Sequence, residues 1–239
     1  MTTARSITVD SAPATPWRNG GGVTRELLTW PDATDWRLRI SVADIAADGP
    51  FSAFPGVRRW FVLLSGEGVV LDFADRSLTL RPGDAPLAFD GAAAPGCQLP
   101  GGPVRDLNLM LRGGTGGMAA VSPGAAWSAP AGAQAGLFAR VAGNWRSGDE
   151  QRTLPALSLL WFDAPPPGDW HFEPDVPVSV LHSTGATPEP HETPPPRGTA
   201  GLALPDGQCR PPEGGAAKRR GGCFTSGWWL HHIPEGETP

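Results

Sequence analysis

The sequence predicts an all-β protein, built as an antiparallel sandwich or barrel. Short stretches in which apolar and polar side chains alternate recur between residues 7 and 181, and Gly/Pro turn signals separate them. No window of this part has a 3.6-residue apolar period, so helices are not expected there. Many short strands joined by tight turns are typical of a sandwich or a barrel.

The first half of the chain has the clearest strand patterns. In residues 36–44, Trp36, Leu38, Ile40 and Val42 share one face and Arg39 and Ser41 share the other. A hairpin is expected where two apolar runs, 60–64 and 69–73, flank a glycine turn. Further strands are expected at residues 78–81, 87–89 and 104–111. In the last of these, Asp106 and Asn108 fall on one face beside an apolar face.

A glycine-rich link at residues 113–117 leads into a second β region. Its strands are expected at residues 137–141, 157–162, 170–172 and 176–181. Two lobes follow from this division, at about 1–112 and 118–182.

Composition changes near Ser183, and a disordered tail is expected over residues 183–239. From Thr184 onward the chain has ten prolines and ten glycines among 56 residues, with few aliphatic side chains to build a core. The apolar patch Trp228-Trp229-Leu230 could dock on the body, but a fluctuating tail is the favoured interpretation. Translation of this stretch in another reading frame is left open.

Charge and cysteine content narrow the class of protein. Lys and Arg number 19 against 24 Asp and Glu, and such a balance argues against a nucleic-acid-binding surface. The first ten residues hold no apolar leader, and no run approaches the roughly 20 apolar residues of a membrane helix. Three dispersed cysteines fit a reducing compartment. We therefore expect a cytoplasmic protein without nucleic-acid or membrane partners.

The segment Pro16–Glu26 is the most informative part of the sequence. Three consecutive glycines leave the backbone open to a ligand or another strand, and an indole, an amide, a hydroxyl, a guanidinium and a carboxylate surround them. A plain turn explains the glycines about as well as a ligand pocket does. A phosphate loop is excluded, because no Gly-Lys-Ser/Thr ending and no helix follow.

Several blocks together resemble the HutD/Ves family. They are Trp17–Glu26, Trp36–Ile45, Asp48–Arg58, Asp106–Met110 and Leu159–Asp163, and they occur in the expected order across most of residues 7–181. The resemblance implies a two-lobed, cupin-like (bicupin) protein of the bacterial cytoplasm, linked to histidine utilisation or to stress responses. It also implies a small acidic ligand of the formylglutamate type. The tail has no counterpart in this pattern.

The motifs also indicate which residues would bind the ligand. These are Trp17, Asn19, Gly21, Thr24, Arg25, Glu26, Arg39, Ser41, Asp106 and Asn108. An inward Arg25 or Arg39 would bind a carboxylate through its planar fork of donors. Because successive side chains on a strand point to opposite faces, at most two of Thr24, Arg25 and Glu26 are expected to face the pocket.

No metal or other cofactor is expected. Many cupins bind metal through histidines, yet this chain has no histidine before His171. A core histidine is the favoured interpretation of His171, and His182 has no visible partner. The tail pair His231-His232 could bind metal adventitiously.

Binding is favoured over catalysis, with a small organic acid as the ligand and a regulatory role in histidine utilisation. The first alternative is a metal-independent enzyme in which Glu26, Asp44 or Asp106 acts as acid or base. The second is a protein-interaction module, and a homodimer is also left open. Which strand faces line the pocket is undecided: if Trp36, Leu38, Ile40 and Val42 point into the barrel, Arg39 and Ser41 point elsewhere, to the seam between the lobes.

Overall fold

The computed structural model describes residues 3–122, 124–175 and 225–235, and these residues form four antiparallel sheets, named here by their number of strands. The six-stranded sheet contains, in spatial order, β2 (Ala14–Pro16), β3 (Gly22–Trp30), β4 (Leu38–Ile45), β11 (Val104–Arg112), β6 (Val57–Ser65) and β9 (Leu87–Asp90). The four-stranded sheet contains β5 (Gly49–Pro50), β10 (Gly96–Gln98), β7 (Val69–Asp72) and β8 (Ser77–Leu80).

The other two sheets form the second lobe. The five-stranded sheet contains β1 (Ala4–Thr8), β16 (Ser158–Phe162), β13 (Gln134–Ala139), β18 (Gly227–Ile233) and β12 (Thr115–Ala120). The three-stranded sheet contains β15 (Glu150–Leu154), β14 (Gly143–Ser147) and β17 (Trp170–Pro174). The expected all-β class is confirmed, and every strand expected within the described residues is present. The strand expected at residues 176–181 lies outside them.

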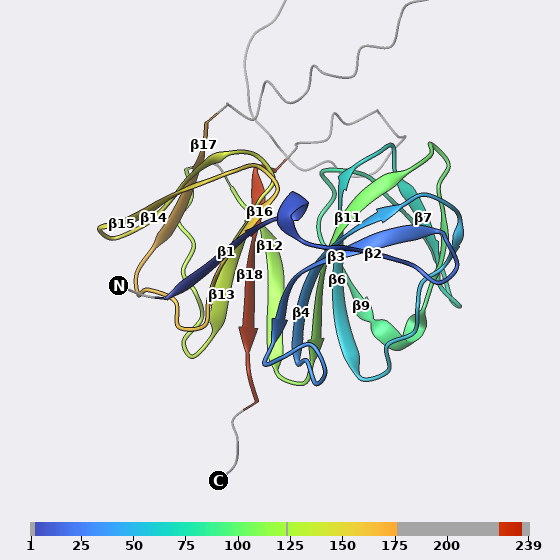
Figure 1. Ribbon diagram of the computed structural model, residues 1–239, viewed down its shortest axis with the longest axis horizontal. Coiled ribbons are helices and arrows are strands. Elements are labelled where there is room, and N and C mark those ends of the chain that lie inside the picture. Colours follow the sequence, from blue (N-terminus) through green and yellow to red (C-terminus); the bar gives the residue numbers. More distant parts are fainter. Residues whose placement is uncertain (1–2, 123, 176–224, 236–239) are drawn as a thin grey trace, which may run out of the picture.

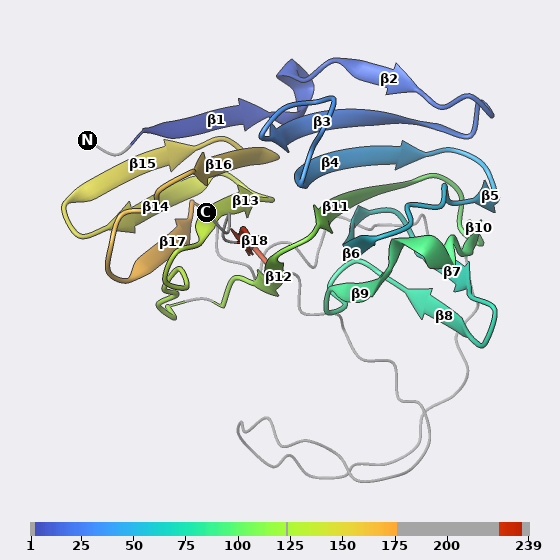
Figure 2. The same ribbon diagram turned by 90° about the horizontal axis from the view of Figure 1, so that it is seen from below.

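Figures 1 and 2 show how the strands of the four sheets are arranged. A hydrophobic core lies between each pair of facing sheets. One core, with Phe61 and Leu71, lies between the four-stranded and six-stranded sheets. The middle core, with Ile40 and Trp161, joins the six-stranded sheet to the five-stranded sheet. The third core, with Trp145, lies between the five-stranded and three-stranded sheets. The two lobes are therefore held together by a continuous apolar layer rather than by a linker alone.

The alternation along β4 decides which side chains reach which core. Leu38, Ile40 and Val42 belong to the middle core and are fully buried against the other lobe. Arg39 and Ser41 point the opposite way, toward the four-stranded sheet. The structure thus answers the question that the sequence left open: the apolar face of β4 forms the seam between the lobes, and its polar face lies inside the first lobe.

The N-terminal strand crosses between the lobes. β1 pairs with β16, with Arg5 opposite Trp161, so it completes the five-stranded sheet although it opens the chain. The 3-10 turn η1 (Val9–Ser11) follows, and Val9 is buried in the middle core. The expected glycine link at residues 113–117 is also partly strand, because β12 begins at Thr115.

The C-terminal segment corrects the expectation of a disordered tail for residues 227–233. β18 pairs with β13 on one side and β12 on the other, so it lies in the interior of the five-stranded sheet. Trp228 is 1% exposed and packs in the middle core, while Trp229 packs in the core on the other side of the sheet. Two adjacent indoles suit this position, because both faces of an interior strand are covered.

Two further observations concern the described residues as a whole. None of them forms a helix long and apolar enough to cross a membrane. Residues 183–224, the larger part of the expected tail, and His182 lie outside the described ranges.

We expect Trp228→Ala to lower the free energy of unfolding by about 3–5 kcal/mol, because it empties a buried indole site in the core that joins the lobes. Urea denaturation of the full chain measures this. The exposed Gln151 of β15 provides the control, and Gln151→Ala should change the midpoint little. Equal small effects of both substitutions would mean that β18 does not contribute to the core.

Candidate functional site

A pocket of about 940 Å³ lies on the face of the six-stranded sheet that turns toward the four-stranded sheet. Its floor is formed by side chains of β3, β4, β6 and β11, namely Thr24, Glu26, Arg39, Ser41, Ala43, Arg59, Asp106, Asn108 and Met110. Its rim is formed by the end of β2 with the loop after it, and by the end of β5 with the loop after it. The first segment supplies Thr15, Pro16, Trp17, Arg18 and Asn19, and the second supplies Pro50, Phe51, Ser52 and Phe54.

Strand register brings the floor residues together in rows. Ser41 lies opposite Asn108 on one side and Glu26 on the other, across the paired strands β11, β4 and β3. In the next row, two residues further along β4, Ala43 lies between Asp106 and Thr24. Because every second residue of each strand points to this face, residues far apart in sequence converge on one polar surface.

The glycine loop forms one wall of the pocket. Trp17 Nε1 donates to Thr24 Oγ1 at 2.7 Å, and the Asn19 side chain accepts from the backbone N–H of Gly21 at 3.0 Å. Gly20 has φ of +72°, a conformation that favours glycine. At Gly22 an added Cβ would lie 2.4 Å from the Asp44 carbonyl oxygen and 3.2 Å from the Trp17 ring. Gly20 therefore permits the turn, and Gly22 leaves room for the Trp17 indole to lie against the strands β3 and β4.

Two opposite charges on the floor form an ion pair. Arg39 Nε lies 2.9 Å from Glu26 Oε2, across the pair β3–β4, and Glu26 is the more exposed partner. Apart from this pair, the floor contains two charged residues, Arg59 and Asp106.

Arg59 and Asp106 are joined through Asn108. Arg59 Nη2 donates to Asn108 Oδ1 at 2.8 Å, and Asn108 Nδ2 donates to Asp106 Oδ1. All three side chains are buried, with exposed fractions of 6%, 6% and 1% in the order Arg59, Asn108 and Asp106. The Arg59 Nε atom has no hydrogen-bond partner among the described residues. The guanidinium therefore keeps one buried donor that the described residues do not satisfy.

Burial shifts the proton affinity of both charged groups. It raises the pKa of Asp106 to about 8, against the opposing attraction of Arg59. It lowers the pKa of Arg59 to about 10, with the Asp106 charge opposing and the Arg39 charge adding to this shift. At neutral pH Arg59 is therefore charged, while Asp106 is mostly protonated.

Aromatic rings surround the Arg59 guanidinium. Its carbon lies 5.1 Å from the ring centres of Phe51 and Phe89, and 5.8 Å from that of Phe54. Such contacts stabilise a cation that has left water. They also give the pocket apolar walls, the usual setting for a few oriented polar groups.

Three residues named from the sequence lie elsewhere. Arg25 points to the opposite face of β3, where its Nη1 lies 2.7 Å from Asp44 Oδ2. Arg105 Nε lies 2.5 Å from the other oxygen of Asp44, and this hydrogen bond holds the pKa of Asp44 below its usual value. Gly21 does not line the pocket, and its carbonyl accepts from the Ala46 backbone N–H at 2.8 Å. Alternation explains the exclusion of Arg25, since Thr24 and Glu26 on either side of it take the inward positions.

The residue that sequence reasoning missed is Arg59. The signal was present in the run from Arg59 to Leu63, because an inward-facing Phe61 and Leu63 require Arg59 to face inward as well. Phe51, Phe54 and Met110 supply apolar side chains to the lining of the pocket.

Among the residues that the structure describes, the histidines do not form a second candidate site. His232 is buried and its Nδ1 lies 3.1 Å from Gln134 Oε1, while His231 packs near Trp127. Among the described residues, no three His, Cys, Asp or Glu side chains gather closely enough to hold a metal ion. Cys97 is buried, and burial raises its pKa to about 12, so its thiol stays protonated.

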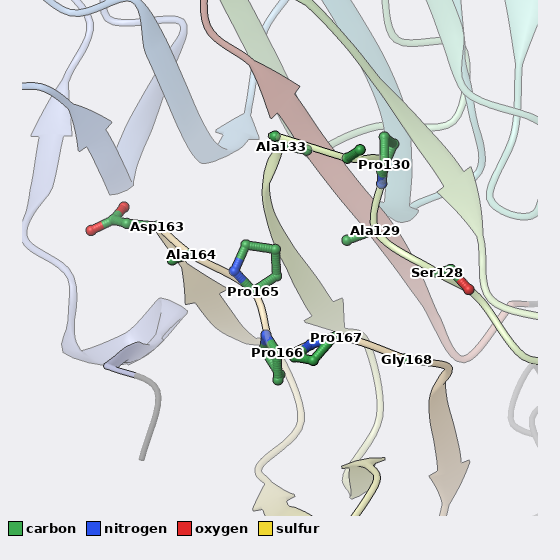
Figure 3. Close-up of a pocket in the computed structure, with 12 residues that line it drawn as sticks. Ser128, Ala129, Pro130, Ala133, Asp163, Ala164, Pro165, Pro166, Pro167 and Gly168 are labelled. Carbon is green, nitrogen blue, oxygen red and sulfur yellow. The ribbon is translucent and has the colours of Figure 1, made fainter.

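A second hollow, of about 530 Å³, lies in the other lobe between residues 128–133 and 163–168 (Figure 3). Alanine, proline and glycine make up most of its lining. Figure 3 shows the Asp163 carboxyl pointing away from the prolines, and this group pairs with Arg5 at 2.5 Å. The Ser128 hydroxyl donates to Asp169 at 2.7 Å. Without converging free polar groups this hollow offers little chemistry, so the pocket of the first lobe is the candidate site.

Comparison with known proteins agrees with the resemblance seen in the sequence. Residues 10–178 match the family model described as HutD. An uncharacterised 21.2 kDa protein in the hutC 3′ region of Pseudomonas putida is 38% identical over 115 residues, which is 46% of this chain and 59% of that protein. The chain thus spans less than two thirds of that relative. Protein Ves of Citrobacter koseri is 35% identical over 153 residues, 63% of this chain and 79% of that protein.

A solved structure shows the same fold. HutD from Pseudomonas fluorescens superposes with a TM-score of 0.61 at 24% identity, covering 72% of this chain and all of that one (100%). The two-lobed, cupin-like antiparallel fold expected from the sequence is thereby confirmed.

The glycine loop yields a test of how the wall is built. Gly22→Ala should lower the free energy of unfolding by about 1–3 kcal/mol, because the new methyl group meets a backbone carbonyl that cannot move aside cheaply. Gly21→Ala is the matched control, since its nearest contact, at 3.3 Å, is the Asn19 side chain. Urea denaturation of both variants measures the difference, and a greater loss in Gly21→Ala would contradict this account of the wall.

Proposed function

Because the chain belongs to the HutD family, we propose that it binds a small carboxylic acid in the pocket of the first lobe and acts in histidine utilisation as a binding protein. The observation that carries the proposal is the Arg59 guanidinium, which is buried on the pocket floor and forms no ion pair among the described residues. Removing a cation from water is costly unless an anion or several hydrogen-bond acceptors replace the lost hydration. A ligand carboxylate would supply both.

The rest of the pocket supports an organic acid rather than a bare inorganic anion. Phe51, Phe54 and Met110 offer apolar contact area to a carbon chain. Ser41 and Asn19 place polar atoms at other points of the lining, where they could orient a second functional group. Arg39, already paired with Glu26, is a secondary cation for a second carboxylate. In this proposal Arg59 takes the carboxylate-binding role that the sequence had suggested for Arg25 or Arg39.

Two features of the relatives support the biological setting. The Pseudomonas putida relative is described by its place in the hutC 3′ region, and the chain matches the HutD model over most of its first three quarters. The ligand class suggested by the resemblance, an acid of the formylglutamate type, agrees with a pocket that combines a buried guanidinium with aromatic walls.

The test is calorimetric titration of the full chain with N-formyl-L-glutamate, L-glutamate and glutarate. The full chain is required, because β18 is part of the core. At least one acid should give saturable heat, and Arg59→Gln should weaken its binding about 10- to 100-fold, the loss expected for a charge-assisted hydrogen bond. Arg58→Gln is the control, since the neighbouring Arg58 is exposed and lies over Trp60 instead.

Unfolding curves for both arginine variants would exclude a folding defect as the cause. Absence of saturable heat with every acid, or equal affinities in Arg59→Gln and the unsubstituted protein, would contradict the proposal.

Catalysis without metal is the second candidate function, and Asp106 is the observation that favours it. This carboxyl lines the pocket and its burial raises its pKa to about 8, near the value that suits proton transfer at neutral pH. Of the three acid/base candidates named from the sequence, Asp44 lies on the opposite face, and Glu26 is held by Arg39.

An enzyme of this kind would convert a pocket acid into a product that NMR spectroscopy detects over hours of incubation. Asp106→Asn should then abolish turnover by removing the acid/base group, while binding persists. Unchanged substrate after prolonged incubation with the full chain would leave binding as the function.

A further inference from the structure

Asp106 and Arg59 share one buried polar chain, but they do not touch directly. The Asn108 amide lies between them, accepting from the guanidinium at 2.8 Å and donating to the carboxyl. An intervening amide transmits less stabilisation to an ionised carboxylate than a direct, bidentate arginine would. Asp106 is therefore buried, at 1% exposure, without the direct cation that normally accompanies a buried carboxylate.

The charges around Asp106 come from several elements. Arg59 of β6, Arg39 of β4 and Glu26 of β3 line the same pocket, with Arg18 at its rim. Behind the floor, the Asp44 carboxylate raises the pKa of Asp106 further. In the four-stranded sheet, burial is the main cause that raises the pKa of Cys97 of β10, and the charge of Asp106 adds to it, so this thiol is neutral.

These groups give the pocket two charge states. With Asp106 protonated, the lining carries Arg18, Arg39 and Arg59 against Glu26 alone. With Asp106 ionised, a second negative charge lies within the same buried chain as Arg59. A carboxylate bound at Arg59 would then face a like charge in a region of low dielectric, which disfavours either the ligand or the ionised Asp106.

We propose that Asp106 is a proton switch for this pocket, carrying a proton whenever an anion is bound beside Arg59. The inference rests on the proposed function for the anion and on the Arg59–Asn108–Asp106 chain for the proton. A protonated carboxyl also presents an O–H donor, so the same proton that removes repulsion adds a hydrogen-bond donor to the site.

The sign of the pH dependence follows directly. An anion raises the pKa of Asp106 above its ligand-free value of about 8. Below about pH 7.5 Asp106 is already protonated, and affinity should not vary with pH on its account. Above about pH 8 a proton must be taken up on binding, so affinity should fall by up to about tenfold per pH unit. Deprotonation of the Arg59 guanidinium, with a pKa of about 10, adds to the loss of affinity only at higher pH.

The experiment is calorimetric titration with glutarate, whose carboxyls stay ionised from pH 6.5 to 9, in two buffers of different ionisation enthalpy. The full chain should take up protons on binding at pH 8.5, and its affinity at pH 9 should be several-fold lower than at pH 7. Asp106→Asn, which keeps the shape of the protonated carboxyl, should bind without proton uptake and with a flat profile. The control Asp75→Asn removes an exposed carboxylate and should keep the full pH dependence.

Proton uptake that persists in Asp106→Asn, or a flat profile in the unsubstituted protein, would overturn the inference. A ligand-free measurement separates it from the proposed function: the ¹³C resonance of the Asp106 carboxyl, assigned by its absence from Asp106→Asn, should titrate near pH 8. If no acid binds at any pH, the proposed function fails. The titration of the Asp106 carboxyl in the ligand-free protein is then the only test of the proton switch. A midpoint near 8 supports the switch, whereas a midpoint below about 6 contradicts it.

Discussion

The alternation of side chains along the paired strands β4 and β11 is the constraint on which the rest of this molecule depends. One face of β4 and β11 supplies the apolar residues that join the two lobes, and the other supplies the polar floor of the pocket. A shift of β4 by one residue against β11 would turn Arg39 into the apolar seam and Ile40 into the pocket. The register that holds the lobes together is therefore also the register that assembles the site, and neither can change without the other.

The pocket illustrates how a sheet can bury charged side chains. Arg59 and Asp106 lie on adjacent strands, and the amide of Asn108 spans the distance between them. Phenylalanine rings cover the guanidinium, which keeps water from satisfying it. A single buried cation with one uncommitted donor atom is poorly satisfied by the protein alone, and this incompleteness distinguishes the pocket from the hollow in the other lobe, where every charged group has a surface partner.

Sequence patterns predicted the fold class and most of the strands of the first lobe, because alternation and glycine turns are local signals. They also predicted eight of the lining residues, Trp17, Asn19, Thr24, Glu26, Arg39, Ser41, Asp106 and Asn108. They did not decide which face of β4 turned inward, since both faces of that strand are covered. Arg25 was assigned to the pocket because its partner Asp44 could not be identified before the pairing of β3 with β4 was known. β18 was missed because its partners lie far away in sequence and the composition before it is that of a tail.

The position of β18 has a consequence for the order in which this protein can reach its native state. Its His232 lies beside Gln134, a contact that spans 98 residues, and its neighbours on both sides are strands made much earlier. During synthesis on the ribosome, β13 and β12 keep unpaired edges until residues 227–233 have emerged. Contacts of such long range slow folding, because the chain entropy is lost before the strand pairing compensates for it. The five-stranded sheet cannot be completed before β18 is made, so a nascent chain of this protein stays exposed to edge-to-edge association until then.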